Sequence, residues 1–93
     1  MSFAAVAKIL DVPVHTLERE SIMFFLEKKL MEIETELLSI SHKYKAKSIR
    51  EFEKVVRKGK ISESTETRDD FFQMDHLEGK REKLRKLLRS LQA

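Results

Sequence analysis

The side chains that could do chemistry are few and scattered along this chain of 93 residues. Of the three histidines, His15 has Glu18 one helical turn away and His76 adjoins Asp75. Carboxylate-bridged di-iron bundles need a Glu-x-x-His motif on facing helices, but a serine and a glutamine stand three residues before His42 and His76. Neither His–acid pair forms a convergent ligand set. We therefore expect no metal site and no cofactor.

Nucleophilic and phosphate-binding motifs are also missing. The chain has no cysteine, which excludes thiol chemistry, disulfides and thiolate metal sites. Its two glycines are 20 positions apart, so they cannot form a glycine-rich phosphate loop. The acidic pair Asp69–Asp70 fits the first turn of a helix better than a catalytic carboxylate pair. These observations predict that the protein is not an enzyme and has no catalytic residues.

The longest apolar pattern runs from Thr16 to about Ala46 without a helix breaker. Apolar residues alternate there at spacings of three and four over three heptads, which is the pattern of a coiled-coil helix. The members of this pattern are Met23, Leu26, Leu30, Ile33, Leu37, Ile40 and Tyr44. They predict one long helix over residues 16–46.

The remaining elements complete a single helical domain over residues 1–93. Residues 1–14 are expected to form a short N-terminal helix or hook. Residues 48–58 form a short helix that starts with a capping box at Ser48 and Glu51. A second long helix covers residues 67–92, where the spacing of three and four recurs up to Leu91.

The two long segments match in length and in charge. At 1.5 Å per residue the second one spans about 38 Å, and the first can pair alongside it. Residues 61–79 hold six acidic and one basic residue, whereas residues 80–93 hold six basic and one acidic residue. Antiparallel pairing sets the basic stretch against the glutamates of the first helix. The basic blocks could instead form a nucleic-acid surface, but we favour pairing within the fold.

The predicted fold is therefore all-α: a long antiparallel helical hairpin, coiled-coil-like, with a short connecting helix and a short N-terminal helix. Apolar side chains remain beyond those that its seam uses, and exposed apolar surface of this size marks an interface. We expect a homodimer with a four-helix core. The alternative is a monomer in which residues 3–14 and 49–58 cover the spare face. The residues expected at the dimer or partner interface are Phe24, Phe25, Met31, Leu38, Phe71 and Leu87.

The segment Ala4–Arg19 resembles the helix-turn-helix of DNA-binding regulators. Ala7 stands at the small position between the helices, and Asp11 occupies the turn position where that family usually has glycine. The resemblance implies base contacts from the start of the second helix, here from His15 and Arg19. Neighbouring glutamates would repel phosphates, so we favour a hook that packs on the bundle.

Two further resemblances concern binding proteins. Residues 17–30, Leu-Glu-Arg-Glu-Ser-Ile-Met-Phe-Phe-Leu-Glu-Lys-Lys-Leu, resemble the dimerisation helix of small antitoxin proteins. Residues 45–61 and 69–72 are similar to short helical-hairpin proteins of thermophilic microbes, some of which look like antitoxins. The resemblance implies a toxin-like protein partner. We thus predict a non-catalytic protein–protein interaction module, with a small DNA-binding regulator as the alternative.

Composition bounds the setting of the protein. The longest uninterrupted apolar run, residues 22–26, is far short of the roughly 20 residues of a membrane span. The first residues lack the basic region of a signal peptide. We therefore expect a cytoplasmic protein that does not bind membranes. Charged residues make up 38% of the chain, asparagine is absent, and this composition is typical of thermophiles.

Overall fold

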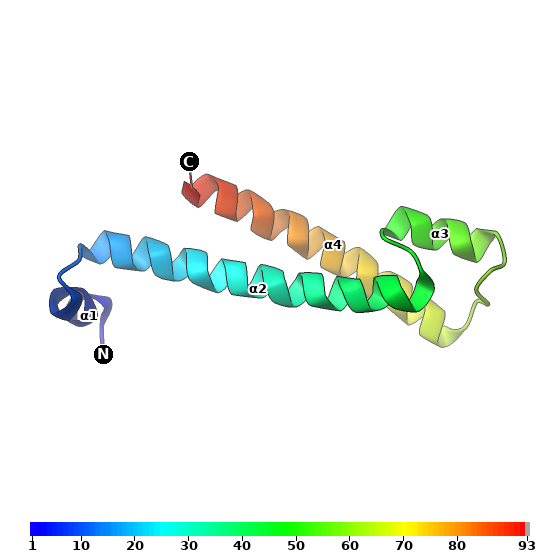
Figure 1. The fold of residues 1–93 in the computed structure, drawn as a ribbon, viewed down its shortest axis with the longest axis horizontal. Helices are drawn as coiled ribbons and strands as arrows, with labels where there is room; N and C mark the ends of the chain where they lie inside the picture. Colours follow the sequence, from blue (N-terminus) through cyan, green and yellow to red (C-terminus); the bar gives the residue numbers. More distant parts are fainter. Residues whose placement is uncertain (93) are drawn as a thin grey trace.

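The computed structural model describes residues 1–92 as four α-helices, with no strand in that range. They are α1 (Phe3–Leu10), α2 (Val14–Tyr44), α3 (Ile49–Arg57) and α4 (Thr65–Gln92). Helices α2 and α4 run alongside each other in opposite directions, with α1 at one end of this hairpin and α3 at the other (Figure 1). The predicted all-α helical hairpin with two short helices is confirmed.

Both long helices begin two residues before the predicted positions. Helix α2 starts directly after Pro13, whose extended backbone leads into the first turn. Helix α4 starts at Thr65 rather than Thr67, because the hydroxyl of Ser64 accepts a hydrogen bond from the Thr67 backbone N–H at 3.1 Å. That contact satisfies one of the free N–H groups at a helix start. The expected connecting loop is shorter as a result.

Helix α3 is bounded by local contacts that the sequence largely predicted. The hydroxyl of Ser48 accepts a hydrogen bond from the Glu51 backbone N–H at 3.2 Å, as in a capping box. The Glu51 carboxylate accepts from the backbone N–H of Lys47, one residue before the expected donor. Past the far end of α3, Gly59 adopts a left-handed φ of 72°, which glycine tolerates without steric cost.

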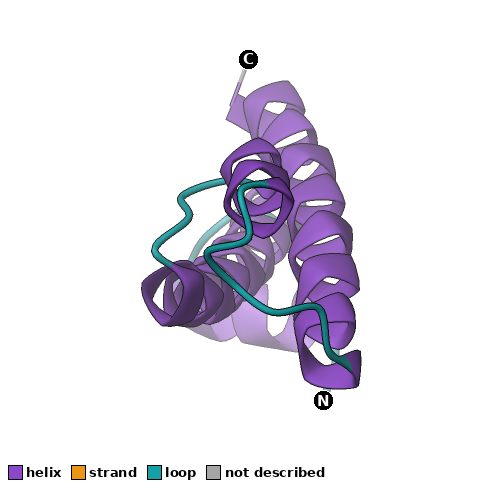
Figure 2. Cartoon of the chain, turned by 90° about the vertical axis from the view of Figure 1, so that its right-hand side faces the viewer, coloured by secondary structure: helices purple, strands orange, loops and turns teal. Residues whose placement is uncertain are grey.

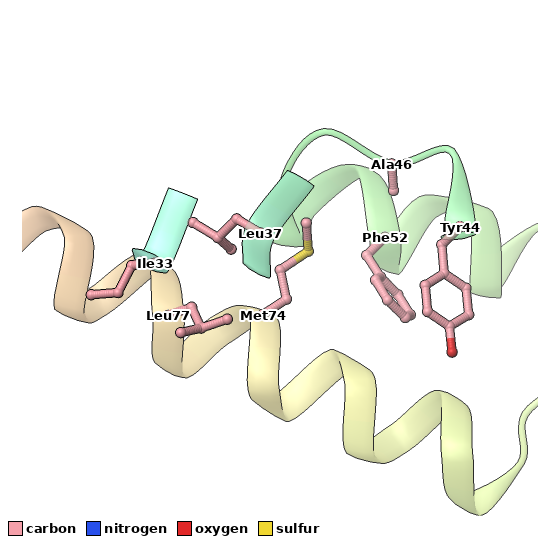
Figure 3. Packing of buried hydrophobic residues seen from close by; sticks show 7 residues of the cluster. All are labelled: Ile33, Leu37, Tyr44, Ala46, Phe52, Met74 and Leu77. Atoms are coloured by element: carbon pink, nitrogen blue, oxygen red, sulfur yellow. The ribbon is translucent and has the colours of Figure 1, made fainter. Parts of the chain in front are cut away.

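The core lies in the seam of the hairpin and extends under α3. Ile33 and Leu37 of α2 lie against Met74 and Leu77 of α4 in one buried cluster (Figure 3). At the α3 end the cluster continues through aromatic rings. Phe52 is fully buried, with its ring centre 4.5 Å from that of Tyr44 and 5.4 Å from that of Phe71. Figure 2 looks along the rod from this end.

Polar contacts fix the register of the hairpin. Glu36 accepts a hydrogen bond from the side chain of Gln73 at 3.3 Å, and Arg19 Nε donates to the backbone carbonyl of Leu91 at 3.1 Å. Arg85 pairs with Glu34 at 3.1 Å. Among residues 1–92, this is the only ion pair between the basic stretch and an acid of α2. The ion pairs between the two long helices lie mainly at the α3 end of the hairpin, where Lys43 of α2 pairs with Glu66 and Asp70 of α4.

The molecule is a rod rather than a ball. Its extents are 60 × 26 × 16 Å and its radius of gyration is 18.9 Å, whereas a compact chain of this length would have a radius of gyration of about 12 Å. The hairpin is only two helices thick over most of its length (Figure 1). A core of this shape covers one face of each long helix and leaves the other faces open.

Candidate interaction surface

Three apolar side chains form a stripe along the outside of α2. Phe24, Met31 and Leu38 are 72%, 69% and 56% exposed. Their spacing of seven keeps them on one side of the helix, and at 3.6 residues per turn that side is turned about 130° away from the seam. These three residues, called the α2 stripe below, are among the predicted interface residues, and the structure leaves all three open.

Phe25 and Leu87 lie on a different face. The hydrogen bond between Gln73 of α4 and Glu36 of α2 marks one edge of the hairpin. Phe25 lies three helical turns before Glu36, and Leu87 lies nearly four turns after Gln73, so both side chains are on the side of their helix that faces this edge. Both are exposed, at the same edge of the hairpin. Lys29 Nζ lies 5.5 Å from the centre of the Phe25 ring, within reach of a cation–π contact. The structure therefore divides the predicted interface residues between two faces.

Phe71, the sixth predicted interface residue, contacts the core instead. Its ring meets Phe52 edge-on, and the side chain is half-buried. The next residue, Phe72, was not among the predicted interface residues and is 66% exposed. The two rings border a hollow of about 360 Å³ between α3 and the start of α4. Its other lining residues are Phe52, Glu53, Val56, Arg57, Glu63, Thr67 and Arg68.

Helix α1 adds a second apolar surface that the predicted site did not include. Ala7 is buried where α1 meets α2 of the same chain, but Phe3, Ile9 and Leu10 are all exposed. The start of α1 is capped by the Ser2 hydroxyl, which accepts a hydrogen bond from the Ala5 N–H at 3.2 Å. Its sequence, Phe-Ala-Ala-Val-Ala-Lys-Ile-Leu, has one charge in eight residues. This composition could have indicated from the sequence that α1 belongs to the interaction surface, because an isolated helix rarely presents so few polar groups to water.

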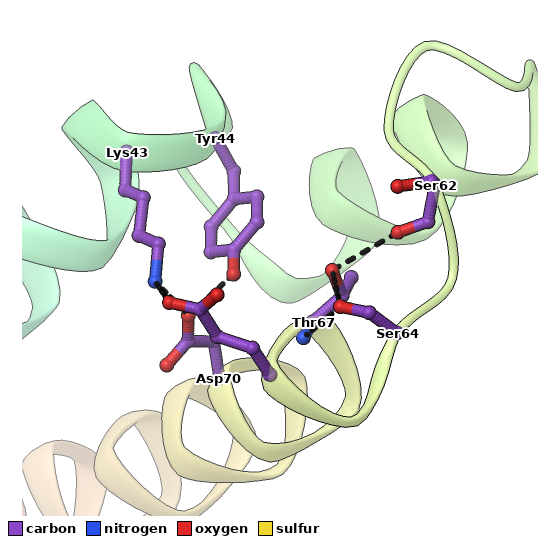
Figure 4. A network of polar contacts seen from close by, with 7 residues as sticks. Lys43, Tyr44, Ser62, Ser64, Thr67 and Asp70 are labelled. Carbon is purple, nitrogen blue, oxygen red and sulfur yellow. Dashed lines mark hydrogen bonds and ion pairs between the residues drawn. The ribbon is translucent and has the colours of Figure 1, made fainter.

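A polar clasp joins the end of α2 to the start of α4 (Figure 4). The carboxylate of Asp70 accepts hydrogen bonds from Lys43 Nζ at 2.7 Å and from the Tyr44 hydroxyl. Lys43 also pairs with Glu66 at 2.5 Å. Nearby, Thr67 is buried, and its hydroxyl donates to the Ser62 carbonyl at 3.0 Å. The clasp holds the closed end of the hairpin, where the aromatic core lies.

The clasp shifts the acidities of its members. Burial acts to raise the pKa of Asp70, but the hydrogen bonds from Lys43 and Tyr44 outweigh it and leave this pKa below its ordinary value. Burial, followed by the hydrogen bond to Asp70, raises the pKa of Tyr44. The hydrogen bonds to Asp70 and Glu66 raise the pKa of Lys43. All three groups are thereby held in the protonation states that bond to one another at neutral pH.

The comparisons with known proteins place the chain in a family. The model of the uncharacterized protein MJ0235 family matches residues 1–93, which is the whole sequence. The chain belongs to this family. Neither the curated proteins nor the solved structures contain a match to it. Membership of the MJ0235 family therefore comes without a partner, a ligand or an activity that could be carried over.

The turn between α1 and α2 is made at Asp11. Asp11 adopts a left-handed conformation with φ 56° and ψ 49°, which aspartate tolerates better than most residues. The predicted DNA-contact residues, however, are placed differently from each other. Arg19 is used at the end of α4, where its Nε donates to Leu91, while His15 lies exposed on the first turn of α2.

Within residues 1–92, no three histidine, aspartate or glutamate side chains come together in a way that could hold a metal ion. In the same range, no helix is both long and apolar enough to cross a membrane. The surface features considered for binding below are the α2 stripe, the Phe25–Leu87 edge, helix α1 and the hollow beside α3.

Proposed function

We propose that the chain is a non-catalytic protein–protein interaction module that works as a homodimer with a shared helical core. The observation that carries this proposal is the α2 stripe. Its large apolar side chains, Phe24, Met31 and Leu38, are more than half exposed, although they recur every seven residues along a regular helix. Regular apolar stripes of this kind are buried by a partner helix in coiled coils and bundles.

The surface area of the chain supports the same proposal. The exposed area is 7255 Å², whereas a compact monomer of this mass would expose about 5,600 Å². The difference of about 1,600 Å² per chain is twice the roughly 800 Å² that each partner buries in a standard protein interface. A second copy can therefore cover the α2 stripe and still leave exposed surface for another protein.

The antitoxin-like role stays a prediction within this proposal. A toxin-like partner would use a surface that dimerisation leaves open, and the Phe25–Leu87 edge lies on a different face of the hairpin from the α2 stripe. Its two exposed apolar side chains are flanked by Lys29. This edge is the place where we expect a heterologous protein to bind.

DNA binding is the alternative, and the left-handed turn at Asp11 favours it. The charge around this turn opposes it, because residues 1–20 hold two basic and three acidic side chains. Affinity for DNA depends chiefly on neutralising phosphates. A mobility-shift assay with random duplex DNA at low salt separates the two functions. A shift that disappears with Arg19→Ala would support the alternative, and no shift removes it.

The dimer proposal is tested with variants on the α2 stripe. The double variant Phe24→Gln and Leu38→Gln replaces exposed side chains only, so helicity by circular dichroism should be unchanged. Light scattering should give twice the 11.0 kDa chain mass for the unmodified protein and 11.0 kDa for the double variant. Ser39→Gln, an exposed neighbour turned away from the stripe, is the control and should remain dimeric. A double variant that still forms dimers contradicts the proposed interface.

A further inference from the structure

The rod has an apolar knob at one end and an apolar hollow at the other. The knob is α1, with Phe3, Ile9 and Leu10 exposed. The hollow lies between α3 and the start of α4 and is bordered by Phe72. Both features are left open at opposite ends of a molecule 60 Å long, so the knob cannot reach the hollow of its own chain (Figure 1).

We infer that a second copy of the chain lies antiparallel along the α2 stripe, and that its α1 covers the hollow of the first copy. This inference rests on the self-association proposed above. It also identifies what completes the hollow: a helix of the partner copy. A two-fold axis makes the contact twice, because each chain supplies one knob and one hollow.

The stripe itself is arranged for such an axis. Met31 is its middle residue, with Phe24 and Leu38 seven residues to either side, and it lies close to the midpoint of α2 at Val14–Tyr44. A two-fold axis at Met31 sets Phe24 of one copy level with Leu38 of the other. The same axis places opposite ends of the two rods side by side, so that α1 of one copy lies at the α3 end of the other.

Charges along α2 favour the antiparallel direction. Residues 14–27 hold three acidic and one basic side chain, and residues 35–48 hold one acidic and three basic side chains. With the axis at Met31, these two stretches face each other across the interface. A parallel dimer would instead set acid against acid and base against base, which is unfavourable at interfaces.

The chemistry of knob and hollow also matches. Phe52, Val56 and the two adjacent phenylalanines provide an apolar floor and wall, and the rim is polar. The rim includes Glu63 and Arg68, neither of which makes an ion pair with any residue from 1 to 92, and the pair Glu53–Arg57. Lys8 is the only charged residue of α1 and is exposed. An apolar helix with a single cation suits an apolar hollow whose charged lining, two acidic and two basic side chains, has no net charge.

Single cysteines test the direction, because the natural chain has none. In the antiparallel dimer, Met31→Cys meets its own copy and should form a disulfide-linked dimer on mild oxidation. Phe24→Cys should not link to itself, since the two copies would be separated by 14 residues, or about 21 Å along the helix. A mixture of Phe24→Cys and Leu38→Cys should form mixed dimers. Self-linking of Phe24→Cys at the rate of Met31→Cys would show a parallel pair and overturn the inference.

The knob and hollow are tested with Ile9→Cys and Phe72→Cys. We expect the mixed proteins to cross-link through a short bifunctional thiol reagent, and we expect neither variant to do so alone. Ser39→Cys mixed with Phe72→Cys is the control and should not link. A chain that sediments as a dimer but leaves Phe72→Cys as reactive as a free thiol has an open hollow. That result refutes the inference and leaves the proposed homodimer standing, whereas a monomer refutes both.

Discussion

At the scale of single residues, Asp70 makes the hairpin's closed end depend on pH. Its pKa is lowered in the folded chain, so the unfolded chain binds more protons as the pH falls, and folding loses stability in acid. The pKa values of Tyr44 and Lys43 are raised instead. Their contribution is complete below about pH 10 and is lost as the pH rises further. The clasp thus stabilises the fold between these two limits.

Asp70→Asn is expected to lower the free energy of unfolding by about 1 kcal/mol at pH 7, because the charged hydrogen bonds from Lys43 and Tyr44 are weakened. The variant should also lose stability less steeply than the natural chain as the pH falls below the ordinary carboxyl pKa of 3.8. Chemical denaturation at several pH values measures both effects. Asp69→Asn, exposed on the same turn, is the control. Equal acid dependence in all three proteins would contradict the role of Asp70.

Phe52→Ala is expected to be the most damaging single truncation in α3. The side chain is fully buried between the Tyr44 and Phe71 rings, and removing a buried phenylalanine costs about 3–5 kcal/mol. Arg50→Ala on the exposed side of the same helix should change stability by less than about 0.5 kcal/mol. Thermal unfolding of the two variants measures this difference. Similar melting temperatures would mean that α3 does not pack as described.

Adjacent residues also mark the limit of what the sequence could predict. Phe71 and Phe72 are both large and apolar, and the sequence pattern assigned only Phe71 to the interface. In the structure Phe71 contacts Phe52 of α3, whereas Phe72 is exposed. The periodicity of α4 locates its seam with α2. The periodicity carries no information on which side of that seam a third helix packs. The side on which α3 packs decides whether Phe71 or Phe72 is buried.

At the scale of elements, the two long helices follow directly from local spacing. Alternating threes and fours place Ile33 and Leu37 opposite Met74 and Leu77, and this seam is the buried cluster. The starts of the helices were less predictable, because they depend on individual capping groups such as Ser64. The ion pairs of the basic stretch were overestimated. The net charge of a stretch shows which stretches attract each other. Within residues 1–92, however, only Arg85 of the basic stretch forms an ion pair with an acidic residue of α2.

The two glycines predict opposite results for the same substitution. Gly59 has a left-handed φ of 72°, so Gly59→Ala should cost about 1 kcal/mol although the site has room for a Cβ. Gly79 lies inside α4 with nothing near its added Cβ, so Gly79→Ala should add about 1 kcal/mol of stability through helix propensity. Urea unfolding of both variants tests the pair. The same sign of change for both would contradict the assigned backbone conformations.

At the scale of the whole molecule, the rod shape explains why so much apolar surface stays open. Two packed helices bury one face each, and neither α1 nor α3 folds back over the α2 stripe. The sequence predicted this surplus, because it has more apolar side chains than the seam uses. It could not predict that Phe25 and Leu87 lie on a separate face, because that depends on how α2 and α4 are rotated against each other, which the Glu36–Gln73 contact reveals.

Sedimentation equilibrium of the unmodified chain tests self-association most directly. Across micromolar concentrations, we expect a single species of twice the 11.0 kDa chain mass, dissociating only on strong dilution. The reason is the 1,600 Å² or so of surface that the rod exposes beyond a compact monomer. A mass of 11.0 kDa at every concentration, with full helicity retained, would mean that the α2 stripe faces water in the working protein, and it would contradict the homodimer.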